Sequence, residues 1–174
     1  MKVSAIAKVV TVATLLSLLG YLSLKAGDFA EKSALKRDEK RLSQLGSLAE
    51  KVVVYEKMKG SYPAANPQWM DVMIEASVLD RLPPKIEGTS CDTNMSQNYC
   101  YAMKGTQVVI YTKLESRLQN ARCSGNSAWG LYSLTNGRGG ILCLTTEPSE
   151  MILDDSSVAP VNHYPTDYTN SFLP

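Results

Sequence analysis

The chain carries few of the residue types that catalysis or metal binding requires. His163 is the only histidine, which gives a histidine metal site or a Ser-His-Asp relay little to build on. Asp154 and Asp155 are adjacent carboxylates, and calcium prefers hard oxygen ligands of this kind. A solvated acidic turn is the simpler interpretation of that pair. We therefore expect no enzyme, no catalytic or cofactor-binding residue and no metal, with calcium at Asp154 and Asp155 as the one weak candidate.

Two shorter motifs also bear on chemistry. Gly137, Gly139 and Gly140 lie between two predicted strands. A phosphate cradle requires a helix start at that point, so these glycines predict a turn. Asn94-Met95-Ser96 matches the acceptor sequon for N-glycosylation, a short motif with a high false-positive rate.

The four cysteines are Cys91, Cys100, Cys123 and Cys143. An even number behind an apolar N-terminus indicates disulfides in an oxidising compartment. Zinc is the rival interpretation, but no C-x-x-C pair is present, so a four-cysteine zinc site fits poorly. Four cysteines allow three pairings, and sequence alone does not choose among them. The shortest loops favour Cys91–Cys100 and Cys123–Cys143, and we predict this pairing because each bond would close a local loop beside a strand.

The composition fits one domain with a small anchor or tail. The chain has 174 residues, of which 44% are hydrophobic and 20% charged, and its net charge is +1. These values argue against global disorder and against a nucleic-acid surface, which needs a clear basic excess. The cluster of cations at Lys36, Arg37, Lys40 and Arg41 is diluted by Asp38 and Glu39. We interpret that cluster as the solvated face of a helix.

The N-terminal segment predicts a membrane anchor over residues 1–26. Val9 to Leu24 contains no charge, and counting from Val3 with a snorkelling Lys8 makes the run long enough to cross a bilayer. A secretory signal cleaved after Ala26 is the alternative, although the residues before that point are not small. Cations flank the run on both sides, so the positive-inside rule is ambiguous. The cysteines place the globular part outside the cytoplasm, on a single-pass protein of the cytoplasmic (inner) membrane.

The elements expected after the anchor form an α+β domain over residues 27–145. Apolar residues recur at spacings of three and four from Leu42 to Val53, which predicts one helix from about Lys8 to Lys57, with or without a bend near Gly27. A short second helix is expected over residues 67–79, because Asn66-Pro67 is a good helix start. Two hairpin patterns, over 99–112 and 129–145, predict a four-stranded antiparallel β-sheet that packs on the first helix. Residues 146–174 have no clear periodicity and are expected to form an irregular C-terminal tail.

Several fragments together indicate a family. They are Arg37-Asp38, Lys40-Arg41-Leu42, Leu45, Tyr55 and Gly60-Ser61-Tyr62-Pro63, followed by Leu82-Pro83-Pro84, Tyr99-Cys100-Tyr101, Gly105-Thr106 and Tyr111-Thr112-Lys113-Leu114-Glu115. In this order they resemble the type IV pilin and type II secretion pseudopilin family over roughly residues 34–115. The resemblance implies a pilin-like fold and assembly with other pilin-like subunits through the apolar N-terminal helix. Some secretion pseudopilins hold calcium in a late loop, and Asp154-Asp155 is similar in position.

The N-terminus departs from the family pattern. A prepilin has a short basic leader that ends in glycine, and a glutamate near the start of its mature helix. The position of that glutamate falls near Val10, which cannot carry a charge. The sequence therefore predicts a minor or initiating subunit of a pilus or pseudopilus-like filament. The alternative is a membrane-anchored extracytoplasmic binding or adhesion domain with a pilin-like fold that does not polymerise.

Overall fold

The computed structural model describes residues 5–88 and 91–148. Before Lys25, side chains are described only at Thr14, Ser17, Gly20 and Tyr21. Of the predicted tail, Thr146 to Pro148 is described and the remainder lies outside the described residues.

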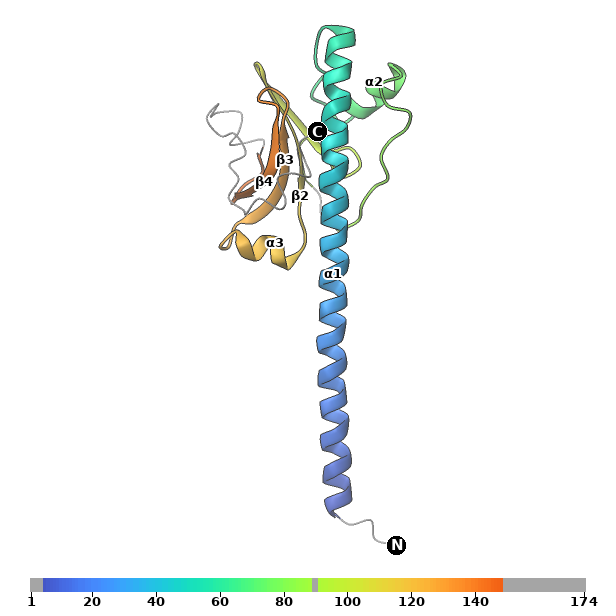
Figure 1. Ribbon diagram of the computed structural model, residues 1–174, viewed down its shortest axis with the longest axis vertical. Helices are drawn as coiled ribbons and strands as arrows, with labels where there is room; N and C mark the ends of the chain where they lie inside the picture. The colour runs from blue at the N-terminus through green and yellow to red at the C-terminus, as the bar shows by residue number, and fades with distance from the viewer. Residues whose placement is uncertain (1–4, 89–90, 149–174) are drawn as a thin grey trace.

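One helix, α1 (Ala5–Lys59), runs the length of the molecule (Figure 1). The prediction of a continuous helix is confirmed, and α1 passes Gly27 without a break. It ends where Gly60 adopts a φ of 75° and donates its N–H to the Glu56 carbonyl, as expected of a glycine at a helix C-terminus. Counting only the residues whose side chains the structure describes, no helix is long and apolar enough to cross a membrane.

The four strands are β1 (Cys100–Lys104), β2 (Gln107–Lys113), β3 (Ser127–Ser133) and β4 (Arg138–Leu144). They form one sheet in the order β1-β2-β3-β4, and every neighbouring pair is antiparallel. The prediction of an α+β fold with a helix on a four-stranded antiparallel sheet is thereby confirmed. Between β3 and β4 the register pairs Ser133 with Arg138, so the expected glycine-rich segment is a tight turn followed by a strand.

Two short helices complete the domain. The first, α2 (Trp69–Glu75), is shorter than the expected span of 67–79, because turns precede it and Ser77 with a φ of 58° follows it. The second, α3 (Arg117–Arg122), connects β2 to β3 and was not predicted. Figure 1 shows α3 at the end of the domain that faces the N-terminus of α1.

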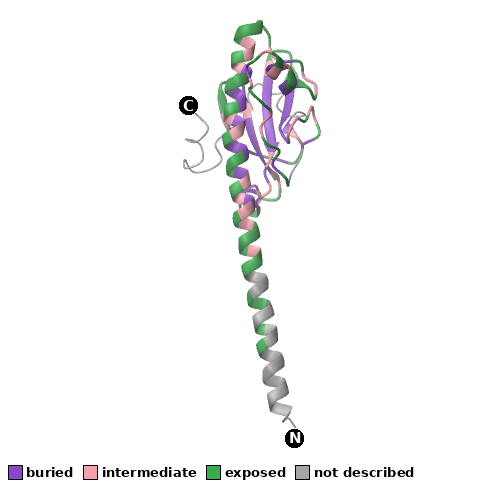
Figure 2. Ribbon diagram, turned by 90° about the vertical axis from the view of Figure 1, so that its right-hand side faces the viewer, coloured by how far each residue is buried: buried purple, intermediate pink, exposed green. Residues whose placement is uncertain are grey.

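The main core lies between α1 and the sheet, where Figure 2 shows the buried residues facing one another. Leu45 and Val52 on α1 are fully buried. Close approach is possible because residue 130 of β3 is glycine: a Cβ there would lie 2.5 Å from Leu42 Cδ2. Two tyrosines attach β1 and the segment before it to α1 and its C-terminal turn. The Tyr99 hydroxyl donates to Gln44 Oε1 at 2.6 Å and the Tyr101 hydroxyl to the Pro63 carbonyl at 3.1 Å.

Candidate functional site

The start of α3 is held by two carboxylates of α1. Glu31 accepts hydrogen bonds from the backbone N–H groups of Arg117, at 3.1 Å, and Leu118, at 2.9 Å. Asp38 accepts from the N–H groups of Glu115, at 3.0 Å, and Ser116, at 2.9 Å. The first N–H groups of a helix have no partner within the helix and carry partial positive charge. Two carboxylates placed seven residues apart therefore satisfy four consecutive donors.

Ser116 completes the N-terminus of α3 from within its own segment. Its Oγ accepts a hydrogen bond from the backbone N–H of Gln119 at 3.2 Å, which makes it the N-cap residue. The N–H of Asn120 bonds to the Ser116 carbonyl at 3.1 Å, so the helical hydrogen-bond pattern begins there. This short helix is thus fixed to α1 at its first turn.

Beside these contacts lies a buried ion-pair network. Arg41 Nη1 is 2.7 Å from Asp38 Oδ1 and 2.7 Å from Glu115 Oε1. Its Nη2 donates to the Glu87 carbonyl. Arg37 adds a two-pronged contact from the solvent side, with Nε 2.6 Å from Glu115 Oε1 and Nη2 3.1 Å from Oε2.

The structure corrects the interpretation of the basic cluster at residues 36–41 as a solvated face. Asp38 is 0% exposed and Arg41 is 1% exposed, whereas Lys36 and Lys40 are exposed as expected. The correction has a physical reason. Asp38 and Arg41 neutralise one another and meet backbone donors and an acceptor from the domain, so their burial leaves few polar groups without partners.

The network also sets the protonation of its carboxyls. Burial raises the pKa of the Glu115 carboxyl, but the hydrogen bonds from Arg37 and Arg41 outweigh that effect, so its pKa lies below the ordinary value of 4.5. The pKa of Glu31 is also lowered, chiefly by the hydrogen bond from the N–H of Leu118. Both groups are therefore held as carboxylates, the form in which they accept hydrogen bonds and pair with arginine.

This arrangement is suited to fixing one element on another. Its arginines and carboxylates are engaged with one another or with backbone groups, and the site presents no nucleophile paired with a base. The described residues contain no group of three His, Cys, Asp or Glu side chains that could hold a metal ion. We call this set of residues the junction, because it joins α1 to the rest of the domain. It consists of Glu31, Arg37, Asp38, Arg41 and Glu115–Leu118.

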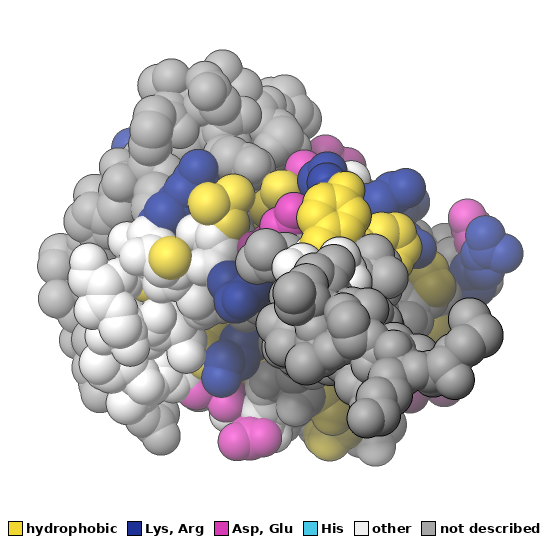
Figure 3. Space-filling view, turned by 90° about the horizontal axis from the view of Figure 1, so that it is seen from below, with side chains coloured by type: hydrophobic (Ala, Val, Ile, Leu, Met, Phe, Trp, Pro, Cys, Tyr) yellow, Lys and Arg dark blue, Asp and Glu magenta, His cyan; other side chains and the backbone are white. Residues whose placement is uncertain are grey.

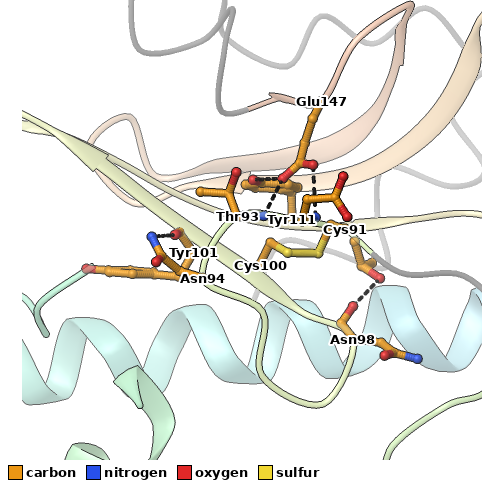
Figure 4. Close-up of a disulfide and its surroundings, with 10 residues drawn as sticks. Cys91, Thr93, Asn94, Asn98, Cys100, Tyr101, Tyr111 and Glu147 are labelled. Atoms are coloured by element: carbon orange, nitrogen blue, oxygen red, sulfur yellow. Dashed lines mark hydrogen bonds between the residues drawn. A yellow bond between two sulfur atoms is a disulfide. The ribbon is translucent and has the colours of Figure 1, made fainter. Parts of the chain in front are cut away.

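The cysteines lie away from the junction and form two disulfides. Cys91 is joined to Cys100 and Cys123 to Cys143, which is the pairing that loop length favoured. Glu147, which belongs to the predicted irregular tail, anchors the chain beside the first disulfide (Figure 4). It accepts from the N–H groups of Asp92 and Thr93 at 3.0 Å each and from the Tyr111 hydroxyl.

The remaining candidates divide into those described and those not. Asn94 of the glycosylation sequon is half-buried, and its Nδ2 donates to the Tyr101 carbonyl at 3.1 Å, so the atom that a glycan would modify is already engaged. Gly137 has a φ of 60° in the β3–β4 turn, and the element that follows it directly is strand β4, whereas a phosphate cradle needs a helix start there. Asp154, Asp155 and His163 lie outside the described residues.

A shallow groove lies where α1 meets the segment after α2. It has a volume of about 220 Å³ and is lined by apolar and polar side chains, among them Gln44, Leu48, Leu79 and Pro83. No charged pair or nucleophile distinguishes it as a reaction site.

Comparison with known proteins returned no match: no protein-family model, no curated protein and no solved structure is significantly similar to this chain.

Proposed function

We propose that this chain is a structural subunit of a filament similar to a type IV pilus or a type II secretion pseudopilus, in a minor or initiating role. The observation that supports this is the free N-terminal half of α1. Beyond α3, Figures 1 and 2 show α1 running clear of the other elements of the chain. A straight helix rises about 1.5 Å per residue, so the part from Ala5 to Ala30 extends roughly 40 Å from the domain.

The sequence of this free half requires a partner. Between Val9 and Leu24 there are nine valines and leucines and no charged residue. Removing such side chains from water is worth roughly 1.5–3 kcal/mol each, which gives about 15–25 kcal/mol for the set. A bilayer supplies such an environment, and so does a bundle of the same helices from neighbouring subunits. The subunit then has two locations, one in the cytoplasmic (inner) membrane with its domain outside the cytoplasm, and one in a filament at the cell surface.

The junction supports a structural role for the same reason. A subunit whose helix must pack among others gains from a fixed angle between helix and domain, because each neighbour's position depends on it. Hydrogen bonds and ion pairs at Glu31, Asp38 and Arg41 span nearly three turns of α1 and oppose rotation about its axis.

The residue at position 10 distinguishes a minor subunit from a major one. In the family that the chain resembles, a glutamate at this point compensates the N-terminal charge of a neighbour within the filament. Val10 cannot do so, and an unpaired ammonium buried in an apolar bundle is costly. The same observation favours a second candidate, a membrane-anchored extracytoplasmic binding or adhesion domain that does not polymerise.

Negative-stain microscopy of the full-length protein, in detergent and after its removal, tests the proposal. We expect monomers or small oligomers from this chain alone, and its entry into fibres when a second pilin-like protein is added. Long uniform fibres of this chain alone would overturn the minor role. If this chain stayed out of the fibres formed by every pilin-like protein that was added, the result would favour the non-polymerising domain.

A matched pair of variants separates packing from folding. Leu18→Arg places a charge in the apolar run, where it costs about 2.5–3.5 kcal/mol at a membrane centre. It is expected to reduce both flotation with vesicles and entry into fibres. Val54→Arg makes the same kind of change on the exposed side of α1, where Val54 is 44% exposed, and is expected to leave both unchanged. Equal behaviour of the two variants would contradict the role assigned to the free half.

A further inference from the structure

The end of the domain that faces the free half of α1 exposes large apolar side chains. Phe29 is 74% exposed, Tyr21 57% and Leu118 43%. Tyr21 and Phe29 belong to α1, and Leu118 belongs to α3, whose first turn bonds to Glu31 of α1. Aromatic side chains left in water at this level of the molecule require an explanation other than the core.

Cationic side chains are exposed on the same parts of α1 and α3. They are Lys25, Lys32, Lys36, Arg117 and Arg122, all of them exposed. The carboxylates at the same level are Asp28 and Glu31, and Glu31 is already engaged by the backbone of α3 and by Arg117 Nε at 3.4 Å. Lys25 Nζ lies 5.6 Å from the centre of the Tyr21 ring, a cation–π contact. Viewed from below, Figure 3 shows Lys and Arg side chains set around apolar ones on this face. We call these eight residues the basal patch.

The heights of Phe29 and of α3, in the middle of the basal patch, match the headgroup layer of a bilayer. The uncharged run of α1 ends at Leu24, and the contact with α3 is made at Glu31, seven residues further along. Seven residues of helix rise about 10 Å. The headgroup region beyond the hydrocarbon core is about 5–8 Å thick on each side. With Leu24 at the edge of the core, Phe29 therefore lies within the headgroups and α3 lies at their outer surface.

We propose that the basal patch is a docking surface for the headgroups of an anionic lipid bilayer, which hold the base of the globular domain at the membrane. Aromatic side chains prefer the interface between headgroups and hydrocarbon, and lysine and arginine pair with anionic headgroups. The patch combines both chemistries on one rigid unit, because the junction prevents α3 from moving independently of α1. This inference rests on the membrane anchor of the proposed function.

Reconstitution of the full-length protein into vesicles tests both steps separately. Flotation reports the anchor. Docking is reported by Leu118→Trp, whose fluorescence is quenched by lipids that carry a nitroxide on the headgroup. The native Trp69 and Trp129 are 0% and 5% exposed and supply a nearly constant background. Phe29→Trp is a second probe on α1, which covers the case that Leu118→Trp fails to fold. Vesicles of phosphatidylcholine alone are compared with vesicles that also contain phosphatidylglycerol.

We expect strong quenching of Leu118→Trp with phosphatidylglycerol and weak quenching without it. Each cation near an anionic surface favours docking about fivefold, so Lys32→Glu with Lys36→Glu is expected to weaken docking by about 25-fold or more. Lys57→Glu with Lys59→Glu makes the same charge change in the last turn of α1, far from the patch, and should leave quenching unchanged. Added salt should reduce quenching while flotation persists.

The outcomes are distinguishable. Flotation without quenching of either probe would overturn the docking surface and leave the anchor standing. Quenching that is equal in both lipids, or insensitive to the lysine reversals, would also overturn it, because the charges would have no part in the contact. A failure to float would refute the anchor itself.

Discussion

Asp38→Asn is the sharpest test of the junction. The substitution preserves the shape of the side chain but removes its charge and turns one acceptor into a donor. In the structure both Asp38 oxygens accept: Oδ1 takes hydrogen bonds from Arg41 Nη1 at 2.7 Å and from the N–H of Glu115, and Oδ2 from the N–H of Ser116 at 2.9 Å. An amide NH₂ placed at either position faces a donor. At least one buried N–H or guanidinium group then loses its partner.

The size of the effect follows from burial. Asp38 is 0% exposed and Arg41 1% exposed. Removing one member of a buried ion pair costs about 3–5 kcal/mol, because the remaining charge is left without compensation. Arg41 keeps its contact with Glu115, so we expect the lower part of that range. For a chain of this size each kcal/mol lowers Tm by roughly 2–4 °C, which corresponds to a fall of about 6–12 °C.

Urea and thermal unfolding in detergent, followed by circular dichroism, measure this loss. Asp28→Asn is the matched control, since it makes the same chemical change on the same helix at an exposed position, and should stay within about 0.5 kcal/mol of the parent protein. If Asp38→Asn and Asp28→Asn had equal stabilities, the buried network would not hold the domain. A double-mutant cycle of Asp38→Asn with Arg41→Met should give a coupling of about 1 kcal/mol or more.

Three other changes probe the remaining contacts. The pKa of Glu115 is lower in the folded state than in the unfolded state, so its contribution to stability is present above pH 4.5 and is lost as pH falls through the folded-state pKa. Glu115→Gln should flatten this acid dependence, measured by urea titrations run from pH 6 to pH 3. Gly130→Ala puts a Cβ 2.5 Å from Leu42 Cδ2 and should lower the free energy of unfolding by about 1–3 kcal/mol, measured by urea unfolding. Replacing both Cys91 and Cys100 with serine removes a disulfide of sequence separation 9 and should lower the free energy of unfolding by about 3 kcal/mol on the chain-entropy model. Added reductant should then shift the unfolding transition of this variant less than that of the parent protein.

The elements that the sequence predicted correctly are those specified by local hydrophobic pattern. The stripe from Leu42 to Val53 has helical spacing, and its members are buried as expected except Val53, which is half-buried. The period of two in the hairpins placed all four strands within a few residues of their observed bounds. Such patterns report burial directly, because each apolar side chain must be removed from water wherever its neighbours lie.

The junction could not be predicted in the same way, because its members are charged. Glu31, Asp38, Leu45 and Val52 are seven residues apart in succession, so the two carboxylates continue the apolar stripe toward the N-terminus. A pattern of hydrophobic residues can be followed toward the N-terminus only as far as Leu42, so it does not include the two carboxylates. A search for any side chain at these positions, apolar or charged, would have indicated that residues 31 and 38 face the domain.

The helix α3 was missed for a related reason. It has six residues, too few for a periodic pattern, and its hydrogen-bond acceptors come from α1 at sequence separations of 77 to 87. Its only local signal is Ser116, a common N-cap residue. An isolated helix of this length is unstable in water, so its existence depends on carboxylates that no local window contains.

The geometry of the junction has a consequence for both proposed environments of the protein. Glu31 and Asp38 hold the start of α3 at two points along α1 that are about 10 Å apart. The domain can therefore neither rotate about α1 nor slide along it. The distance from the end of the apolar run to the base of the domain is then set by the seven residues between Leu24 and Glu31 alone. In a membrane this spacing fixes the height of the basal patch above the hydrocarbon. In a filament it fixes how far the apolar bundle lies below the layer of globular domains. One short stretch of helix therefore constrains both states, and a length that suits lipid headgroups must also suit the packing of neighbouring subunits.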